Sequence, residues 1–169
     1  MTEKGGTLKR EKSKEQLAAD FALLQRDMQK ECAAQERFIR QCQRLVQAEG
    51  DPAALLDLLP CPAAVFEQSG ILRAANGLLF EHTDLSLEDI SAGKINFLGR
   101  VTDENYAIQA AAEGVFYGKT AFLSRIYYIL ELFCKGWSYA ASEHYHRALL
   151  FPLPDRAGVI PCGVVMLLK

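Results

Sequence analysis

Two histidines separated by one residue are the clearest candidates for metal chemistry in this chain. His144 and His146 occupy alternate positions of a predicted strand, so both imidazoles point to the same face of it. Neutral imidazole is a common zinc ligand, and Glu143 or Cys134 could complete a site. The same pair could instead change charge near neutral pH. A polar outer strand face explains the pattern more simply, so we expect no metal site here.

Cysteine is the other residue type with a reactive side chain. The five cysteines are Cys32, Cys42, Cys61, Cys134 and Cys162. Their number is odd and no two are spaced as Cys-x-x-Cys, so the sequence indicates neither a disulfide framework nor a zinc knuckle. We expect reduced cysteines that pack as small apolar residues.

The sequence lacks the familiar motifs of catalysis. It contains no Gly-x-Ser-x-Gly, no phosphate-binding loop and no His-Glu-x-x-His. Covalent catalysis needs a nucleophile on a turn with a base nearby, and no segment offers that arrangement. We therefore expect that the protein is not an enzyme.

The distribution of charged and apolar residues limits the partners and the location. The net charge of -2 is too weak to indicate a nucleic-acid-binding face. The apolar run 121–133 is interrupted by Arg125 and Glu131, and it is shorter than the roughly 20 residues that span a bilayer. The basic N-terminus lacks the apolar run of a signal peptide. These features predict a cytoplasmic protein without a nucleic-acid or membrane partner.

The N-terminal part of the chain is predicted to be a disordered tail followed by a long helix. Residues 1–13 are basic and polar. Residues 14–49 are dominated by good helix formers, with no proline or glycine. Apolar residues then repeat at spacings of three and four, as in the heptad seam of a coiled coil. The predicted dimerisation residues are Leu17, Phe21, Leu24, Met28, Phe38, Cys42 and Leu45.

The seam does not decide whether the helix pairs with a second copy, or in which orientation. Polar Glu31 and Gln35 interrupt it, and a second stripe through Cys32 resembles a stutter. The helix could pair with a second copy, in a parallel or an antiparallel arrangement, or it could pack only along its own domain. We favour dimerisation. The apolar stripe near the C-terminal end is wider than a two-helix seam requires, which indicates that this end also contacts the globular part.

The residues after the long helix predict a short, rigid connection and then a globular domain over 52–169. Gly50 suits the end of the helix, Asp51 an N-cap and Pro52 the first turn of a short helix over 52–59. Strands are predicted over 63–66 and 71–75, separated by a glycine turn. Asn76 can cap the next helix, and Ser86 with Asp89 matches a capping box.

This order of elements resembles the start of a PAS domain, a sensory and dimerisation module. The matching residues are Leu58-Leu59-Pro60, Ser69-Gly70, Ala75-Asn76, the segment 85–90, Gly93, Phe97 and Val101-Thr102-Asp103. Segments 145–153 and 158–168 resemble the last two strands of the PAS sheet. The resemblance implies an α+β fold, a PAS-like five-stranded antiparallel sheet flanked by short helices, here preceded by a long N-terminal α-helix.

The middle of the chain departs from the PAS pattern and allows two interpretations. A helix over 104–115 fits the family. In one interpretation the third strand is 121–126, and 127–143 is an insertion that contains an apolar helix. In the other, 120–133 is an extra helix and the third strand is 137–141, where Trp137, Tyr139 and Ala141 alternate.

The resemblance also implies where cofactors would be held. A flavin-binding light sensor of this family needs a reactive cysteine in a motif that the segment 93–100 lacks. A haem-binding member usually carries its axial histidine on the helix after Asp103, and 105–115 contains none. No cofactor is therefore firmly indicated, and a ligand, if present, would be a small molecule in an apolar pocket with a few polar contacts.

The sequence thus predicts a sensory and signal-transduction module that forms a homodimer. It would bind a small molecule or a downstream signalling protein. The candidate pocket residues are Asn96, Phe97, Arg100, Tyr106, Phe122 and Tyr139. Two alternatives remain, a ligand-free structural adaptor and a redox or gas sensor that carries haem or flavin.

Overall fold

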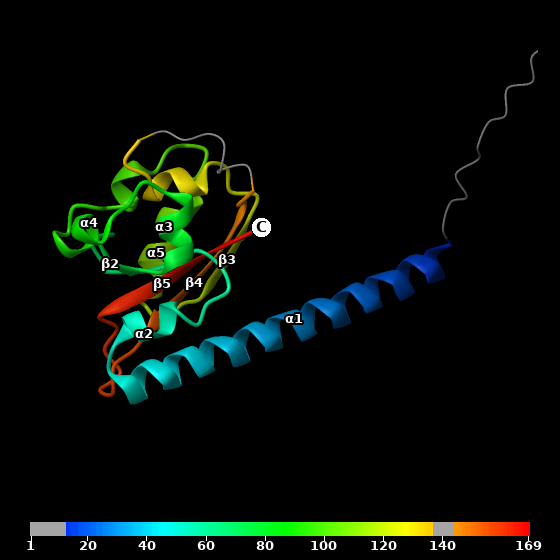
Figure 1. Ribbon diagram of the computed structural model, residues 1–169. Coiled ribbons are helices and arrows are strands. Elements are labelled where there is room, and N and C mark those ends of the chain that lie inside the picture. Colours follow the sequence, from blue (N-terminus) through cyan, green and yellow to red (C-terminus); the bar gives the residue numbers. More distant parts are fainter. Residues whose placement is uncertain (1–12, 137–143) are drawn as a thin grey trace, which may run out of the picture. The chain divides into compact units, whose positions relative to one another are not determined.

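The computed structural model describes residues 13–136 and 144–169, which fall into two compact units, Met1–Ile39 and Arg40–Lys169. Helix α1 (Lys14–Glu49) begins in the first unit and ends in the second, and it matches the predicted long helix (Figure 1). Ser13 and Gln16 cap its start reciprocally, because the side chain of each accepts the backbone N–H of the other.

The second unit is built on a five-stranded antiparallel sheet in the order β2-β1-β5-β4-β3. Its strands are β1 (Ala63–Phe66), β2 (Leu72–Ala75), β3 (Ala121–Ser124), β4 (Arg147–Leu153) and β5 (Cys162–Leu168). The longest pairing joins β4 to β5, from Arg147 opposite Leu168 to Leu153 opposite Cys162. The fold class is α+β, as predicted.

Short helices connect the strands, and several begin where the sequence predicts a cap. The helices are α2 (Pro52–Leu56), α3 (Gly77–His82), α4 (Leu87–Ser91), η1 (Leu98–Arg100), α5 (Ala107–Val115) and η2 (Ile129–Phe133). Asp51 caps α2, Asn76 caps α3, and Ser86 with Asp89 forms the predicted capping box of α4. Gly50 has a positive φ of 76° after the last turn of α1.

One face of the sheet and the helices between β2 and β4 form the main core. The sheet contributes Ala64, Phe66, Ala148, Leu150, Val165 and Leu167. Leu79 of α3, Ile90 of α4 and Ile108 of α5 pack against this face. At Gly163 the approach is close, since a Cβ there would lie 2.6 Å from Val115 of α5 and 2.9 Å from Phe66. Helix α5 therefore packs in direct contact with the sheet at Gly163.

The third strand follows the first of the two interpretations. Strand β3 pairs with β4, with Ala121 opposite Leu150, so the predicted helix over 120–133 is wrong. The reason is the alternation of the segment, in which Ala121 and Leu123 are partly buried and Phe122 and Ser124 are exposed. The predicted insertion contains the short apolar helix η2. The other predicted strand, 137–141, lies outside the described residues.

Several boundaries differ from the predicted ones. Strand β5 begins at Cys162 rather than at 158, because Asp155 and Val159 close a turn and Pro161 cannot donate to the sheet. Strand β4 begins at Arg147, and helix α5 starts at Ala107. The predicted tail over 1–13 lies outside the described residues except for Ser13. None of the helices in the described part of the chain is long and apolar enough to span a membrane.

Candidate functional site

A cleft of about 450 Å³ lies between the segment that leads into α5 and helix η2. It is lined by Arg100, Thr102, Asp103, Glu104, Asn105, Tyr128, Glu131, Leu132 and Gly136. This volume falls in the range of small-molecule pockets. Three of the lining side chains are carboxylates and one is a guanidinium, so the lining is acidic on balance.

Glu131 is the unusual residue of this cleft. Its side chain is buried, with 7% of the residue exposed, and neither carboxylate oxygen has a hydrogen-bond partner in the part of the chain that the structure describes. Burial raises the pKa of the Glu131 carboxyl, and the nearby Glu104 carboxylate raises it further. Buried polar groups are nearly always paired, so an unpaired carboxyl marks a place where a donor is missing.

The packing of η2 explains why Glu131 is buried. Its neighbours Leu130 and Leu132 are each 1% exposed and belong to the core or its border. Tyr128, the residue that precedes its first turn, has a left-handed backbone with φ of 56°. Arg125 just before it has a φ of 58°. Such conformations cost energy in residues other than glycine and persist only where the surroundings impose them. The core contacts of η2 therefore fix the position of Glu131 in the wall of the cleft.

Arg100 joins the two walls of the cleft. One guanidinium nitrogen donates to the backbone carbonyl of Glu131 at 3.4 Å, and another donates to the carbonyl of Lys135 at 2.7 Å. On the same wall, Asn105 accepts the Thr102 N–H at 2.8 Å and holds the turn before α5. Arg100 is thus a predicted pocket residue that the structure places in the cleft.

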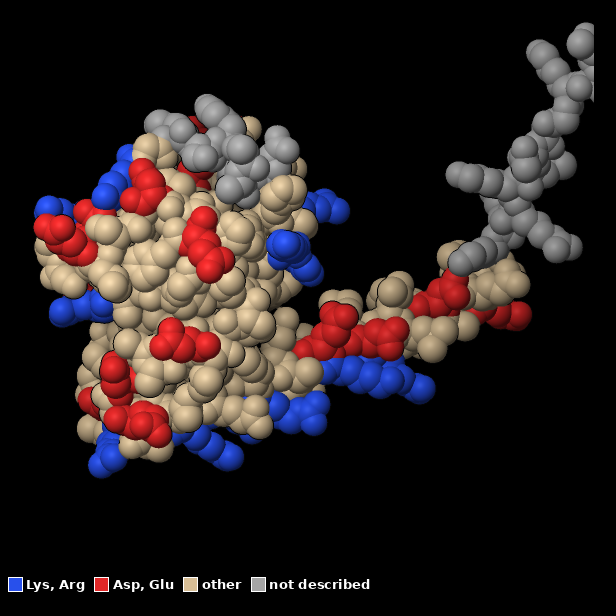
Figure 2. Space-filling view, viewed as in Figure 1, with Lys and Arg blue, Asp and Glu red and all other residues tan. Residues whose placement is uncertain are grey.

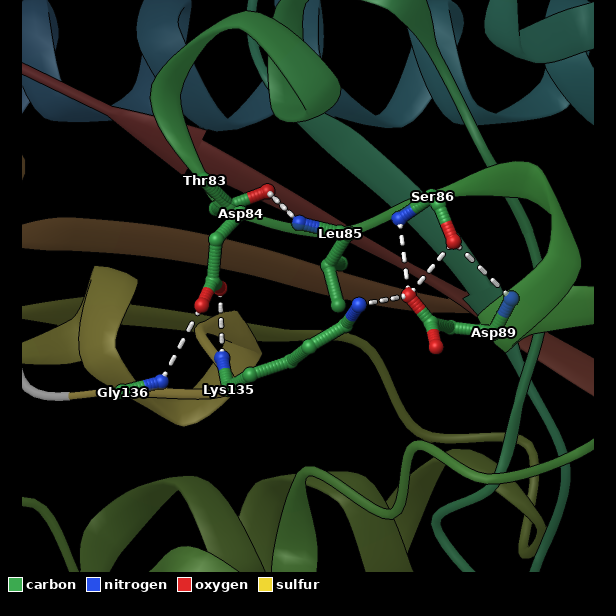
Figure 3. Close-up of polar contacts among 7 residues, drawn as sticks. All are labelled: Thr83, Asp84, Leu85, Ser86, Asp89, Lys135 and Gly136. Carbon is green, nitrogen blue, oxygen red and sulfur yellow. Dashed lines mark hydrogen bonds and ion pairs between the residues drawn. The ribbon is translucent and has the colours of Figure 1, made fainter.

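A second set of polar contacts fastens the end of η2 to the loop between α3 and α4 (Figure 3). Asp84 accepts the backbone N–H groups of Lys135 at 2.5 Å and Gly136 at 3.2 Å. The Lys135 ammonium pairs with Asp89, whose carboxylate also accepts the Ser86 hydroxyl at 2.6 Å. The ion pair and these hydrogen bonds lower the pKa of Asp89 to about 2. We call this set the Asp84–Lys135 clasp.

The other predicted pocket residues do not gather around the cleft. Asn96 is a loop residue whose side chain donates to Ser69 and accepts from Gly99. Phe97 is fully buried between Phe66 and Phe133, with ring centroids 5.1 and 5.2 Å away. The remaining three are scattered, with Tyr106 69% exposed, Phe122 44% exposed on β3 and Tyr139 outside the described residues.

The two histidines precede β4, where both are exposed and flank the buried Tyr145. Among the described residues no three His, Cys, Asp or Glu side chains are grouped so that they could hold a metal ion. Cys134 is buried and donates to the Leu130 carbonyl at 3.4 Å, and Glu143 lies outside the described residues.

The cysteines have two kinds of environment. Cys42, Cys61, Cys134 and Cys162 are buried and Cys32 is exposed. Burial raises the pKa of the thiols of Cys42, Cys61 and Cys162 to about 11, and burial also raises the pKa of Cys134. These four thiols are therefore weak nucleophiles in the folded chain.

The predicted dimerisation residues divide along α1. Leu17, Phe21, Leu24 and Met28 are each more than half exposed. Phe38 and Leu45 are partly buried, and Cys42 is buried. We call the first four the apolar stripe of α1. In Figure 2, acidic and basic side chains follow opposite sides of this helix, while both signs are interspersed over the globular unit.

The last turns of α1 are hydrogen-bonded to the end of β4 and to the turn that follows it. The Gln43 amide donates to the Pro152 carbonyl at 2.9 Å. The Arg156 guanidinium donates to the Gln47 carbonyl at 3.2 and 3.3 Å. Cys42 and Val46 are buried in the same region. The C-terminal end of α1 is therefore part of the folded domain, as the wide end of the stripe indicates.

The architecture is the one that the resemblance to PAS domains implies. An antiparallel sheet of five strands carries short helices on one face and follows a long helix. The fold is PAS-like. Neither a protein-family model nor a curated protein matches the chain. Among solved structures it is similar to a sensory box sensor histidine kinase from Vibrio cholerae, at 11% identity and a TM-score of 0.43, over 83% of this chain and 96% of that one.

Glu131 is not among the predicted pocket residues. In the sequence it stands out only as a charge that interrupts an apolar run. That interruption was the available signal, because a single carboxylate within a buried apolar segment is rare unless it is paired.

Proposed function

We propose that this PAS-like protein is a cytoplasmic sensory and signal-transduction module rather than an enzyme. It forms a homodimer through the apolar stripe of α1, binds a small molecule in the Glu131 cleft, and passes the change to a downstream signalling protein. The observation that carries the proposal is the division of α1 into an exposed apolar stripe and a C-terminal end built into the domain.

The stripe is suited to a second copy of the same helix. Leu17, Phe21, Leu24 and Met28 follow the four-three-four spacing of a heptad seam. All four expose more than half of their surface, and pairing would remove that apolar surface from water. A helix that repeats this spacing is self-complementary, because each apolar side chain meets its own counterpart across a two-fold axis.

We propose that the pair is parallel, so that each residue of the stripe meets its own counterpart. The flanking charges do not distinguish the two arrangements, because in a parallel pair Asp20 and Asp27 face Gln25 and Cys32 without forming ion pairs. We expect Leu24→Cys to form an intermolecular disulfide under mild oxidation in a Cys32→Ser background. Failure to cross-link in a dimeric sample would contradict the parallel arrangement.

A route for the signal is present in the contacts at the end of α1. Gln43 connects the last turns of the helix to the end of β4, and Gln47 and Arg156 connect them to the turn between β4 and β5. Strand β4 pairs with β3, which precedes the segment that carries Glu131. A ligand that shifts η2 would thus act on a sheet to which α1 is fastened, and would bias two arrangements of the paired helices.

The dimer is tested by sedimentation with two matched variants. Leu24→Lys places a charge in the stripe, and Leu23→Lys places the same charge on the neighbouring residue, which is equally exposed but lies off the stripe. At tens of micromolar we expect dimers for the native chain and Leu23→Lys, and monomers for Leu24→Lys. A monomeric native chain would refute the proposal.

A second candidate function is a structural adaptor that holds no ligand. The packing of Phe97 between Phe66 and Phe133 favours it, because aromatic rings occupy the space between the sheet and η2. Native mass spectrometry of the purified protein separates the candidates, since a retained small molecule contradicts the adaptor. A visible absorption spectrum tests the third alternative, a haem or flavin sensor.

A further inference from the structure

We propose that the Glu131 cleft binds a small organic cation, an amine or a guanidinium compound, through the Glu131 carboxylate. This inference rests on the proposed function and names the class of its ligand. The starting point is that Glu131 lines a cleft of about 450 Å³ and that, within the described residues, neither of its two buried carboxylate oxygens has a hydrogen-bond partner. Each oxygen can accept hydrogen bonds, and only a donor can satisfy them.

The surrounding charges select a cation. Asp103 and Glu104 line the same cleft, so three carboxylates face one guanidinium there. The guanidinium of Arg100 is held by the carbonyls of Glu131 and Lys135, and its single positive charge is outnumbered by the acidic side chains of the cleft. A ligand with a positive donor would both satisfy Glu131 and lower the repulsion among the carboxylates.

An organic cation fits better than a metal ion. Calcium and magnesium need several oxygen ligands that converge at about 2.0 to 2.6 Å. No group of three acidic, histidine or cysteine side chains in the described residues has that arrangement. An amine needs only two or three acceptors at hydrogen-bond distance, and the Tyr128 ring, which is partly exposed in the cleft, offers apolar surface to a short carbon chain.

Binding would be linked to proton release. In the empty cleft, burial and Glu104 raise the pKa of Glu131, which favours the neutral acid. A bound cation favours the carboxylate, so the acid gives its proton to solvent as the cation enters. The titratable and charged groups around Glu131 are Arg100, Asp103, Glu104, Tyr128 and Cys134. The affinity should therefore fall as the pH is lowered through the raised pKa of Glu131.

The test is calorimetric titration of the full chain with agmatine, and with butylurea as a neutral probe of similar size. We expect agmatine to bind and butylurea not to bind. Titrations at mildly acidic pH in phosphate and in MES, which both buffer there and differ in ionisation heat, should show net proton release. Glu131→Gln keeps the shape of the side chain and removes the charge, and it should weaken agmatine binding about tenfold or more.

Two further variants serve as controls. Glu81→Gln makes the same change at an exposed position on α3 and should leave the affinity unchanged. Glu104→Gln should weaken binding less than Glu131→Gln, and circular dichroism checks that each variant is folded. The inference is overturned if the native chain does not bind agmatine, or if folded Glu131→Gln binds it as tightly. In either case the sedimentation result stands separately, because a dimer without cation binding leaves the proposed module intact.

Discussion

At the scale of single residues, Asn76 shows how one side chain fixes the start of the domain. Its carbonyl oxygen accepts the N–H groups of Leu79 at 3.0 Å and Ala63 at 3.1 Å. Its amide donates to the carbonyls of Cys61 at 2.8 Å and Leu56 at 3.3 Å. The residue is only 3% exposed. One amide therefore ties the end of α2, the entry to β1 and the start of α3.

Asn76→Asp separates these roles. Aspartate keeps the oxygen that caps α3 but replaces the amide donor with a second acceptor, which faces the carbonyls of Leu56 and Cys61. We expect a loss of about 2 kcal/mol or more in the free energy of unfolding, since two buried carbonyls lose their donor. Urea denaturation measures it. A variant as stable as the native chain would show that the capping oxygen alone matters.

At Glu131 we expect a substitution to increase the free energy of unfolding, whereas Asn76→Asp decreases it. Glu131→Gln removes an unpaired buried charge, so it should stabilise the empty protein by about 1 to 3 kcal/mol at neutral pH. Because the folded-state pKa of Glu131 is raised, the native chain loses stability as the pH rises through that value. The gain should vanish below the ordinary carboxyl pKa of about 4. Thermal unfolding across pH measures it, and a gain that persists in acid would contradict the assignment.

These two residues also show what a sequence can predict about a site. The cap at Asn76 depends on residues three positions away, so the local pattern predicts it. Its other hydrogen bonds, and the bond from Arg100 to the Glu131 carbonyl, join residues 13 to 31 positions apart along the chain. Such contacts exist only after the sheet has formed. A sequence therefore indicates candidate pocket residues mainly by their type, and not by the contacts that they make.

At the scale of elements, the seating of α5 on β5 depends on Gly163. A Cβ at this position would lie 2.6 Å from Val115 Cγ1 and 2.9 Å from Phe66 Cζ. Gly163→Ala should therefore cost about 1 to 3 kcal/mol by overpacking. Gly158→Ala is unsuitable as a control because its φ is 83°, whereas Gly77→Ala meets no atom within 4 Å and should cost less. Urea denaturation compares the two variants.

The Asp84–Lys135 clasp makes the link between η2 and α4 depend on pH. The pKa of Asp89 is lowered to about 2, so its stabilising contribution is present above the ordinary value of about 4 and is lost as the pH falls toward 2. Asp89→Asn should be less stable than the native chain at neutral pH, and the difference should shrink over this interval. If the stability difference between Asp89→Asn and the native chain does not change with pH, the charge of Asp89 does not contribute to stability.

The strands were predictable where their patterns are strong. Strand β1 (Ala63–Phe66) has the predicted bounds, because a short apolar run lies between a proline pair and a glycine turn. The third strand was ambiguous because the run that begins at Ala121 is apolar enough for either a strand or a helix. Pairing with β4 decided the outcome, and pairing partners are not visible in a local window.

At the scale of the whole molecule, the order of elements predicted the architecture, and the cleft could not be predicted. The resemblance to PAS domains supplied the five-stranded antiparallel sheet before any contact was known. The cleft arises in the insertion between β3 and β4, where η2 meets the segment before α5. This is the part of the chain in which the family pattern is weakest, so the family offered no guide to the ligand.

The distribution of cysteines has a practical consequence, because it gives the folded protein a set of built-in kinetic probes. Cys32 should react with a thiol reagent at once. The four buried cysteines lie near the end of α1, before β1, at the end of η2 and in β5, so each should be labelled only when its own region opens. Mass spectrometry of labelled peptides should show one fast site and four slow ones. If agmatine binds at η2, it should slow the labelling of Cys134 most.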